Sequence, residues 1–230
     1  MIKDLLPELL VGLDYARLHV SPVYYGVGVP HGSGKPVILV PGALASDCSM
    51  LEMRLWLGRL GYKAYTSGIG RMDDCPDIMR DKLLETIDRA CDETRQKVTL
   101  IGHSLGGMIA RGAALKRSGK VERVIMLAAP FRHPRAHPLV MKAIGLVHGR
   151  NLHRHLHRTD NSCIKCFVEV MRTPIGPVAE AAIYPRNDPV VHWYDCTTFN
   201  GDNDYEVTGT HIGLVANPQV YQIVADLLAR

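Results

Sequence analysis

The sequence predicts an α/β protein with a mostly parallel sheet covered by helices on both faces. From residue 36 to the end of the chain, short apolar segments of strand type alternate with longer segments of helical type. The segment of residues 36–40 is apolar without alternation, which is typical of a parallel strand buried on both faces. The length of 230 residues suits one domain with a sizeable core, so we expect residues 1–230 to form a single domain.

The predicted elements follow one another in a regular order. Residues 4–19 allow a first helix, which the prolines and glycines of residues 22–34 end. We expect strands at 36–40, 62–65, 98–101, 121–127, 179–184 and 205–208, and helices at 47–60, 76–94, 107–117 and 218–228. Residues 131–177 interrupt this alternation, and an insertion of that length is usually functional or helical. It is therefore predicted to form a cap.

Composition narrows the possible functions. Hydrophobic residues make up 47% of the chain and charged residues 22%, as in soluble globular proteins. No apolar run reaches about 18 residues, so no stable membrane insertion is expected. Residues 1–8 carry acids and do not resemble a secretory signal. The net charge of +4 is too modest to indicate nucleic-acid binding. Six thinly spread cysteines indicate a reducing, cytoplasmic setting.

The run Gly102-His103-Ser104-Leu105-Gly106 carries the strongest functional signal. It lies between a predicted strand and a predicted helix, which is the context of a nucleophile elbow with an exposed serine. The flanking glycines suit this turn, because side chains there would collide with the neighbouring strand and helix. Ser104 is therefore the candidate nucleophile.

A serine nucleophile needs a base, and the base needs an acid that orients it. His211 lies between the last predicted strand and the last predicted helix, in a loop with glycines on both sides. Asp188 follows the preceding strand, so the order is serine, acid, histidine. Asp195 and two acids in the polar turn 200–204 are the competitors for the acid, and we favour Asp188.

An oxyanion formed on the substrate needs backbone N–H donors. One is expected from Leu105, the residue after the serine. The second is expected from the loop after the first strand, where Gly42 allows the chain to turn towards Ser104. We favour the amide of Ala43, with Leu44 as the second candidate.

These motifs resemble those of α/β-hydrolases of the small bacterial lipase/esterase type. The matching segments are 40–44, 60–62, 68–71, 102–107, 127–131, 187–191 and 209–214, in the family's order. The resemblance implies a Ser104–His211–Asp188 triad, with the amides of Ala43 and Leu105 facing the oxyanion. One departure is Pro41-Gly42, where many lipases have His-Gly.

In that family, the insertion after residue 131 usually forms a lid over the acyl pocket. We therefore expect a helical cap, with Leu139 and Met141 contacting substrate together with Leu44 and His103. The cap also holds His148, His153, His155, His157, Cys163 and Cys166, which raises the question of zinc. No second Cys-x-x-Cys exists, so we favour a basic cap face with two buried thiols, and neither a metal nor a cofactor.

The predicted function is hydrolysis of a small-molecule carboxylic ester through an acyl-enzyme. An acyltransferase or thioesterase could use the same triad, because the acyl-enzyme is shared. A non-catalytic ligand-binding protein on the same fold is a further alternative, which would need a broken triad. A peptidase or an epoxide hydrolase is less expected, and an epoxide hydrolase of this fold carries Asp at the elbow.

Overall fold

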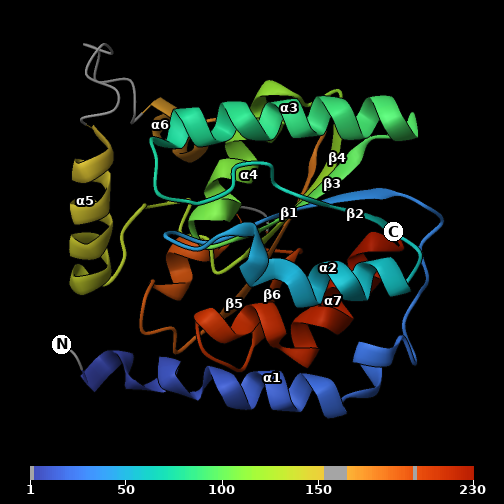
Figure 1. Cartoon of the computed structure of the whole chain (residues 1–230), viewed down its shortest axis with the longest axis horizontal. Coiled ribbons are helices and arrows are strands. Elements are labelled where there is room, and N and C mark those ends of the chain that lie inside the picture. Colours follow the sequence, from blue (N-terminus) through green and yellow to red (C-terminus); the bar gives the residue numbers. More distant parts are fainter. Residues whose placement is uncertain (1–2, 153–164, 199–200) are drawn as a thin grey trace.

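The computed structural model describes residues 3–152, 165–198 and 201–230. Its described part contains a parallel six-stranded sheet in the order β2-β1-β3-β4-β5-β6 (Figure 1). The strands are β1 (Pro36–Val40), β2 (Lys63–Thr66), β3 (Val98–His103), β4 (Val121–Leu127), β5 (Ala179–Pro185) and β6 (Asp204–Val207). Each lies where the sequence predicted a strand, and the predicted fold class is confirmed.

Helices cover both faces of the sheet (Figure 1). On one face lie α3 (Pro76–Thr94), α4 (Leu105–Lys116) and α6 (Lys165–Arg172). On the other lie α2 (Leu51–Arg59), α7 (Pro218–Leu228) and, outside them, α1 (Val11–Val20). The helix α5 (Pro138–Leu152) stands at one side of the molecule, within the predicted cap. Short 3-10 helices complete the described part: η1 (Lys3–Leu10), η2 (Pro22–Tyr25), η3 (Asp47–Met50), η6 (Trp193–Cys196) and η7 (Ile212–Ala216).

The first predicted helix differs from expectation in its first half. Residues 3–10 form the 3-10 helix η1, and α-helical geometry begins only at Val11. Pro7 supplies a reason, because it has no amide hydrogen for the α-helical ladder and its ring disfavours a helix interior.

Two apolar layers hold the helices to the sheet. In β1, Val37 and Leu39 face the layer under α2 and α7, whereas Ile38 and Val40 face the layer under α3 and α4. Strand side chains alternate between faces, so a strand buried on both sides must be apolar at every position. This explains the continuous apolar run of residues 36–40. In the first layer, Trp56 packs against Tyr221 with ring centroids 4.5 Å apart.

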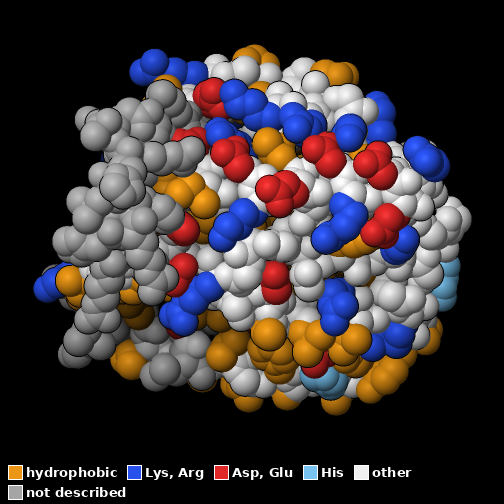
Figure 2. Space-filling model, turned by 45° about the horizontal axis from the view of Figure 1, so that its top comes forward, with side chains coloured by type: hydrophobic (Ala, Val, Ile, Leu, Met, Phe, Trp, Pro, Cys, Tyr) orange, Lys and Arg blue, Asp and Glu red, His pale blue; other side chains and the backbone are white. Residues whose placement is uncertain are grey.

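The surface over α3 carries basic and acidic side chains interspersed rather than gathered by sign (Figure 2). Asp88, for example, lies 3.2 Å from the Arg117 guanidinium and 2.8 Å from the Lys120 ammonium. In the residues the structure describes, no helix has both the length and the apolar character needed to cross a bilayer.

The topology places the predicted functional residues at one edge of the sheet. All strand pairs are parallel, so the carboxyl ends of the strands meet there. The loop with Ala43 follows β1, Ser104 follows β3, Asp188 follows β5, and His211 follows β6. Residues far apart in the chain are thereby brought to one place.

Candidate active site

Ser104 occupies a strained turn between β3 and α4. Its φ of 51° and ψ of −122° are unusual for a residue with a side chain. The turn is closely packed: a Cβ on Gly106 would lie 2.2 Å from the Pro41 carbonyl oxygen, and one on Gly102 would lie 2.5 Å from the Gly106 carbonyl oxygen. Only glycine fits at either position, so the local sequence dictates the turn that exposes Ser104.

Asp188 and His211 form a buried pair. The Nδ1 atom of His211 lies 2.7 Å from Oδ2 of Asp188, and the two side chains are 6% and 0% exposed. The other carboxylate oxygen accepts hydrogen bonds from the backbone amides of Val190 at 2.7 Å and Val191 at 3.0 Å. The carboxylate is thus held by three donors, and it orients the imidazole through Nδ1 alone, which leaves Nε2 available.

The competing acids have other surroundings. Asp195 pairs with the Nδ1 atom of His133 at 2.7 Å. Asp204 accepts a hydrogen bond of 2.8 Å from the backbone amide of Thr198, and Asp202 is exposed. Of the four candidates, Asp188 is the one that contacts His211.

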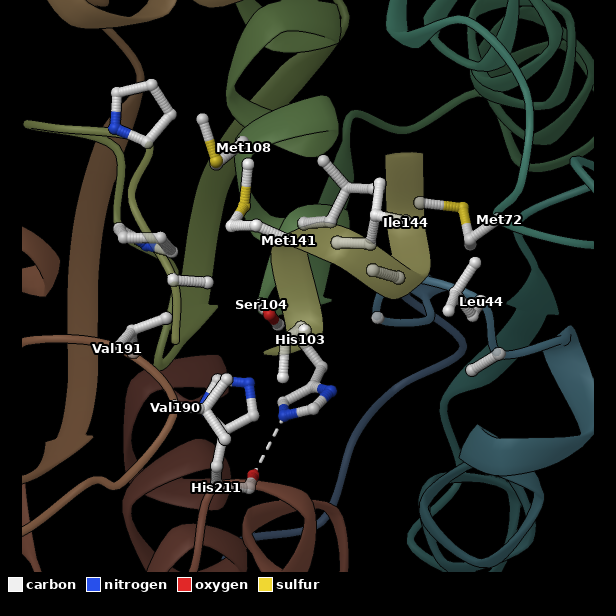
Figure 3. Close-up of a pocket in the computed structure, with 18 of the residues that line it drawn as sticks. Leu44, Met72, His103, Ser104, Met108, Met141, Ile144, Val190, Val191 and His211 are labelled. Carbon is white, nitrogen blue, oxygen red and sulfur yellow. Dashed lines mark hydrogen bonds between the residues drawn. The ribbon is translucent and has the colours of Figure 1, made fainter. Parts of the chain in front are cut away.

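Ser104 and His211 line the same pocket, a cavity of about 480 Å³ (Figure 3). Helix α5 forms one of its walls, the loop after β1 another, and residues 190–191 a third. Most side chains around it are apolar, among them Leu44, Met72, Met108, Met141, Ile144 and Val191. Such a pocket would hold an uncharged, apolar ligand next to the Ser104 hydroxyl.

The backbone amides around Ser104 differ in their partners. The amide of Leu44 donates to the Met72 carbonyl at 2.8 Å, and Leu44 itself has a φ of 61°. Among the described residues, the amides of Ala43 and Leu105 have no protein acceptor, and both residues line the pocket. These two N–H groups therefore have the donor capacity that an oxyanion requires, whereas the Leu44 amide is already used.

His103, a predicted substrate contact, also makes a hydrogen bond to the loop that carries His211. Although it lines the pocket, it is only 8% exposed, and its Nε2 lies 2.9 Å from the carbonyl oxygen of His211 (dashed line in Figure 3). Burial, followed by the neighbouring His211, lowers the pKa of His103 to about 3. The ring is therefore neutral at physiological pH, and its Nε2–H donates to the His211 carbonyl, so this polar group is not available to a ligand.

Comparisons with known proteins bear on the fold. Residues 61–166 match a family model described as serine aminopeptidase, S33. None of the curated proteins matches the sequence. Solved structures similar to this chain include the mature lipase BlEst2 of Bacillus licheniformis, at 16% identity and a TM-score of 0.57, covering 88% of this chain and 95% of that one. The chain has the α/β-hydrolase fold.

Two further structures share the α/β-hydrolase fold with this chain. One is a lipase-esterase related protein from Clostridium acetobutylicum, at 17% identity and a TM-score of 0.56, with 87% and 96% of the two chains covered. The other is naproxen esterase (carboxylesterase NP) from Bacillus subtilis, at 14% identity and a TM-score of 0.57, with 96% and 98% covered. At these identities the likeness is one of fold, and the predicted resemblance to small bacterial lipases and esterases is confirmed at that level.

The structure places one predicted pocket residue away from the cavity. Leu139 does not line the cavity, whereas Val140, Met141 and Ile144 do. On an α-helix, positions 140, 141 and 144 lie within about 100° of one another, and position 139 is turned about 150° from the middle of that face. The apolar composition of this segment alone did not reveal which face of α5 turns to the pocket.

The cysteine prediction also needs correction. Cys48, Cys91 and Cys196 are free, but Cys75 is disulfide-bonded. The predicted cytoplasmic location rested on reduced thiols, and a disulfide counts against it. In the described part of the chain, no cluster of three His, Cys, Asp or Glu residues could hold a metal. Of the cap residues considered for zinc, His153, His155, His157 and Cys163 lie outside the described residues, as do the side chains of His148 and Cys166.

Two acidic residues that no motif indicated reach the His211 loop. Glu8 bonds to the His211 amide, and Asp14 bonds to the Thr210 hydroxyl. The first pair is separated by 203 residues, so no sequence spacing could have indicated it. The only available signal was the presence of acids in a helix that precedes the hydrolase motifs.

Proposed function

We propose that this protein is a serine hydrolase that cleaves carboxylic esters. The observation that carries the proposal is the buried Asp188–His211 pair, whose His211 lines the same apolar pocket as Ser104 on its strained turn. The fold comparisons support hydrolase chemistry in general. The assignment of Ser104, His211 and Asp188 to particular steps is our own.

In the first half of the reaction, the Ser104 oxygen attacks the ester carbonyl carbon while Nε2 of His211 takes the hydroxyl proton. The carbonyl oxygen becomes an oxyanion, which accepts hydrogen bonds from the amides of Ala43 and Leu105. Each such donor contributes about 3–4 kcal/mol to stabilising the transition state. Asp188 keeps the proton of His211 on Nδ1 and stabilises the imidazolium.

In the second half, the imidazolium returns its proton to the departing alkoxide, and the alcohol leaves an acyl group on Ser104. Water then gives a proton to His211 and attacks the acyl carbon, which forms a second oxyanion. Its collapse releases the carboxylic acid, and the proton returns from His211 to the Ser104 oxygen.

The apolar lining of the pocket favours an ester with an apolar acyl chain. Its walls include the side chains of Met108, Met141 and Ile144, and its cavity of about 480 Å³ lies within the size range of small-molecule sites. A medium-length acyl chain placed against these side chains would be removed from water, at about 0.8 kcal/mol for each buried methylene. We therefore propose that acyl chains of this kind are preferred over acetyl.

The test compares wild type with Ser104→Ala and with Ser118→Ala. Ser118 lies in the turn after α4, at the opposite end of the sheet from the pocket, and is the matched control. Wild type and Ser118→Ala should hydrolyse p-nitrophenyl butyrate and react with a fluorophosphonate probe, and Ser104→Ala should do neither. Hydrolysis retained in Ser104→Ala would overturn the proposal. If an added alcohol is converted to a new ester faster than acid is released, the enzyme is an acyltransferase.

A second candidate is an aminopeptidase. The family model that matches residues 61–166 is described in those terms, and two carboxylates, Asp73 and Asp74, line the pocket, where they could attract a substrate ammonium group. Both carboxylates already have partners, which reduces their attraction for a further cation: Asp73 lies 3.3 Å from the Arg71 guanidinium, and Asp74 accepts a hydrogen bond of 2.7 Å from the Cys75 amide. Alanine p-nitroanilide discriminates the two functions: cleavage of this amide at a rate comparable to that of p-nitrophenyl butyrate would favour the peptidase.

A further inference from the structure

The N-terminal segment packs against the loop that carries His211. Helices η1 and α1 lie along the outside of the molecule, next to η7 and α7 (Figure 1). The side chain of Leu18 is fully buried there in the core, which fixes α1 in place. None of the hydrolase motifs lies in this segment, so its position calls for a separate explanation.

Glu8 binds the His211 loop with both carboxylate oxygens. Its Oε1 accepts a hydrogen bond of 2.8 Å from the backbone amide of His211, and its Oε2 accepts one of 2.8 Å from the amide of Ile212. Hydrogen bonds to an ionised acceptor are about twice as strong as neutral ones, and the two-point geometry also fixes direction.

A second carboxylate, six residues along the chain from Glu8, holds the same loop. Asp14 is 5% exposed and accepts a hydrogen bond from the Thr210 hydroxyl at 3.2 Å, while the Thr210 oxygen accepts one from the amide of Gly213 at 3.0 Å. The fit is close, because a Cβ on Gly213 would lie 1.9 Å from Oδ2 of Asp14. The loop is therefore held against the N-terminal segment on both sides of His211.

The backbone of His211 is thus held at both of its polar groups. Glu8 accepts from its amide, and His103 donates to its carbonyl. Asp188 holds only the imidazole, through Nδ1. The position of Nε2 depends on the backbone as well as on this side-chain contact, and an error of about 1 Å in a catalytic group can lower a rate by about 100-fold.

We propose that Glu8 is a positioning residue for His211, so that the N-terminal segment takes part in catalysis through the loop it holds. This inference rests on the proposed function, in which His211 is the base. Glu8 contacts backbone amides rather than reacting atoms, and it acts by fixing where the imidazole lies.

The test measures the rate constant and the end point of fluorophosphonate labelling in Glu8→Ala, Glu8→Asp and a control. The control is Glu52→Gln, because the Glu52 carboxylate lies 3.7 Å from Nε2 of His19 in α1 and so contacts the same N-terminal segment at another point. The end point reports the fraction of folded enzyme, and the rate constant reports how well the base is placed. The turnover of p-nitrophenyl butyrate is measured before labelling and is divided by the number of sites that the probe labels.

We expect Glu8→Ala to label to the same end point as wild type, with a rate constant lower by about 10- to 100-fold. Glu8→Asp, which keeps the carboxylate on a shorter arm, should recover part of that loss, and Glu52→Gln should match wild type. If Glu8→Ala reduces the end point, the variant has lost folded enzyme, and the labelling rate constant of Glu8→Asp is compared with wild type instead. A wild-type rate constant in Glu8→Asp would then overturn the inference, as would a loss in Glu8→Ala no larger than in Glu52→Gln. Activity in Ser104→Ala would instead overturn the proposed function.

Discussion

Asp188→Asn tests how the carboxylate controls His211. The substitution keeps the size of the side chain and replaces one oxygen with an NH₂ group. In the wild type, Oδ1 accepts from the amides of Val190 and Val191, and Oδ2 faces Nδ1 of His211. The asparagine oxygen must keep accepting from the two amides, so its NH₂ group is turned towards His211. The imidazole then has to accept at Nδ1 and carry its proton on Nε2, where it cannot act as a base.

The hydrogen bonds from the Val190 and Val191 amides set the lower limit of the activity loss in Asp188→Asn. To restore an acceptor for Nδ1, the asparagine would have to flip and lose both hydrogen bonds, at about 1 kcal/mol each. That loss of about 2 kcal/mol leaves roughly one molecule in 30 in the productive orientation, since about 1.4 kcal/mol is a factor of ten. Loss of the negative charge beside the imidazolium adds to this, and the same change in other serine enzymes lowers kcat by about 10⁴. We therefore expect Asp188→Asn to lose activity by a factor between about 30 and about 10⁴.

The assay is kcat/KM for p-nitrophenyl butyrate, corrected for the folded fraction by circular dichroism. Asp195→Asn is the matched control, because Asp195 is also buried and also pairs with a histidine, His133, at 2.7 Å, but neither residue lines the Ser104 pocket. It should keep kcat/KM within about threefold of wild type. A folded Asp188→Asn enzyme that loses less than about tenfold would refute the orientation argument.

Three further outcomes are expected. Because the pKa of His103 is about 3 in the folded protein and 6.5 without burial, the unfolded chain binds an extra proton between these values. Stability present above pH 6.5 is then lost as the pH falls, by about 1.4 kcal/mol per pH unit. His103→Gln should remove this slope from urea unfolding at pH 4.5–6.5, and an unchanged slope would contradict the account. Gly106→Ala should lower the free energy of unfolding by more than about 3 kcal/mol, because its Cβ meets backbone 2.2 Å away, whereas Gly119→Ala, with open space around it, should change it by less than about 1 kcal/mol. Ile144→Trp should lower kcat/KM for p-nitrophenyl octanoate about tenfold relative to the acetate, while Leu139→Trp leaves that ratio unchanged; equal ratios in the two variants would count against the placement of α5.

Local patterns were sufficient for the fold. The apolar run of residues 36–40 indicated a buried parallel strand, and Gly102 and Gly106 around Ser104 indicated the turn between a strand and a helix. These features depend on residues within a few positions of one another, where side-chain size and backbone freedom act directly. The chain order of Asp188 and His211 was also sufficient to name them as candidates, because parallel strands bring their carboxyl ends to one edge.

The sequence by itself determined the sheet, the turn at Ser104 and the pair expected to serve it. Only the tertiary structure decided which groups hold that pair in place. It made His103 a donor for the His211 carbonyl, left the Ala43 amide rather than the Leu44 amide free, and brought Glu8 to the His211 loop. The physical reason is range: these are single hydrogen bonds between distant segments, and each depends on helix packing that no local periodicity records.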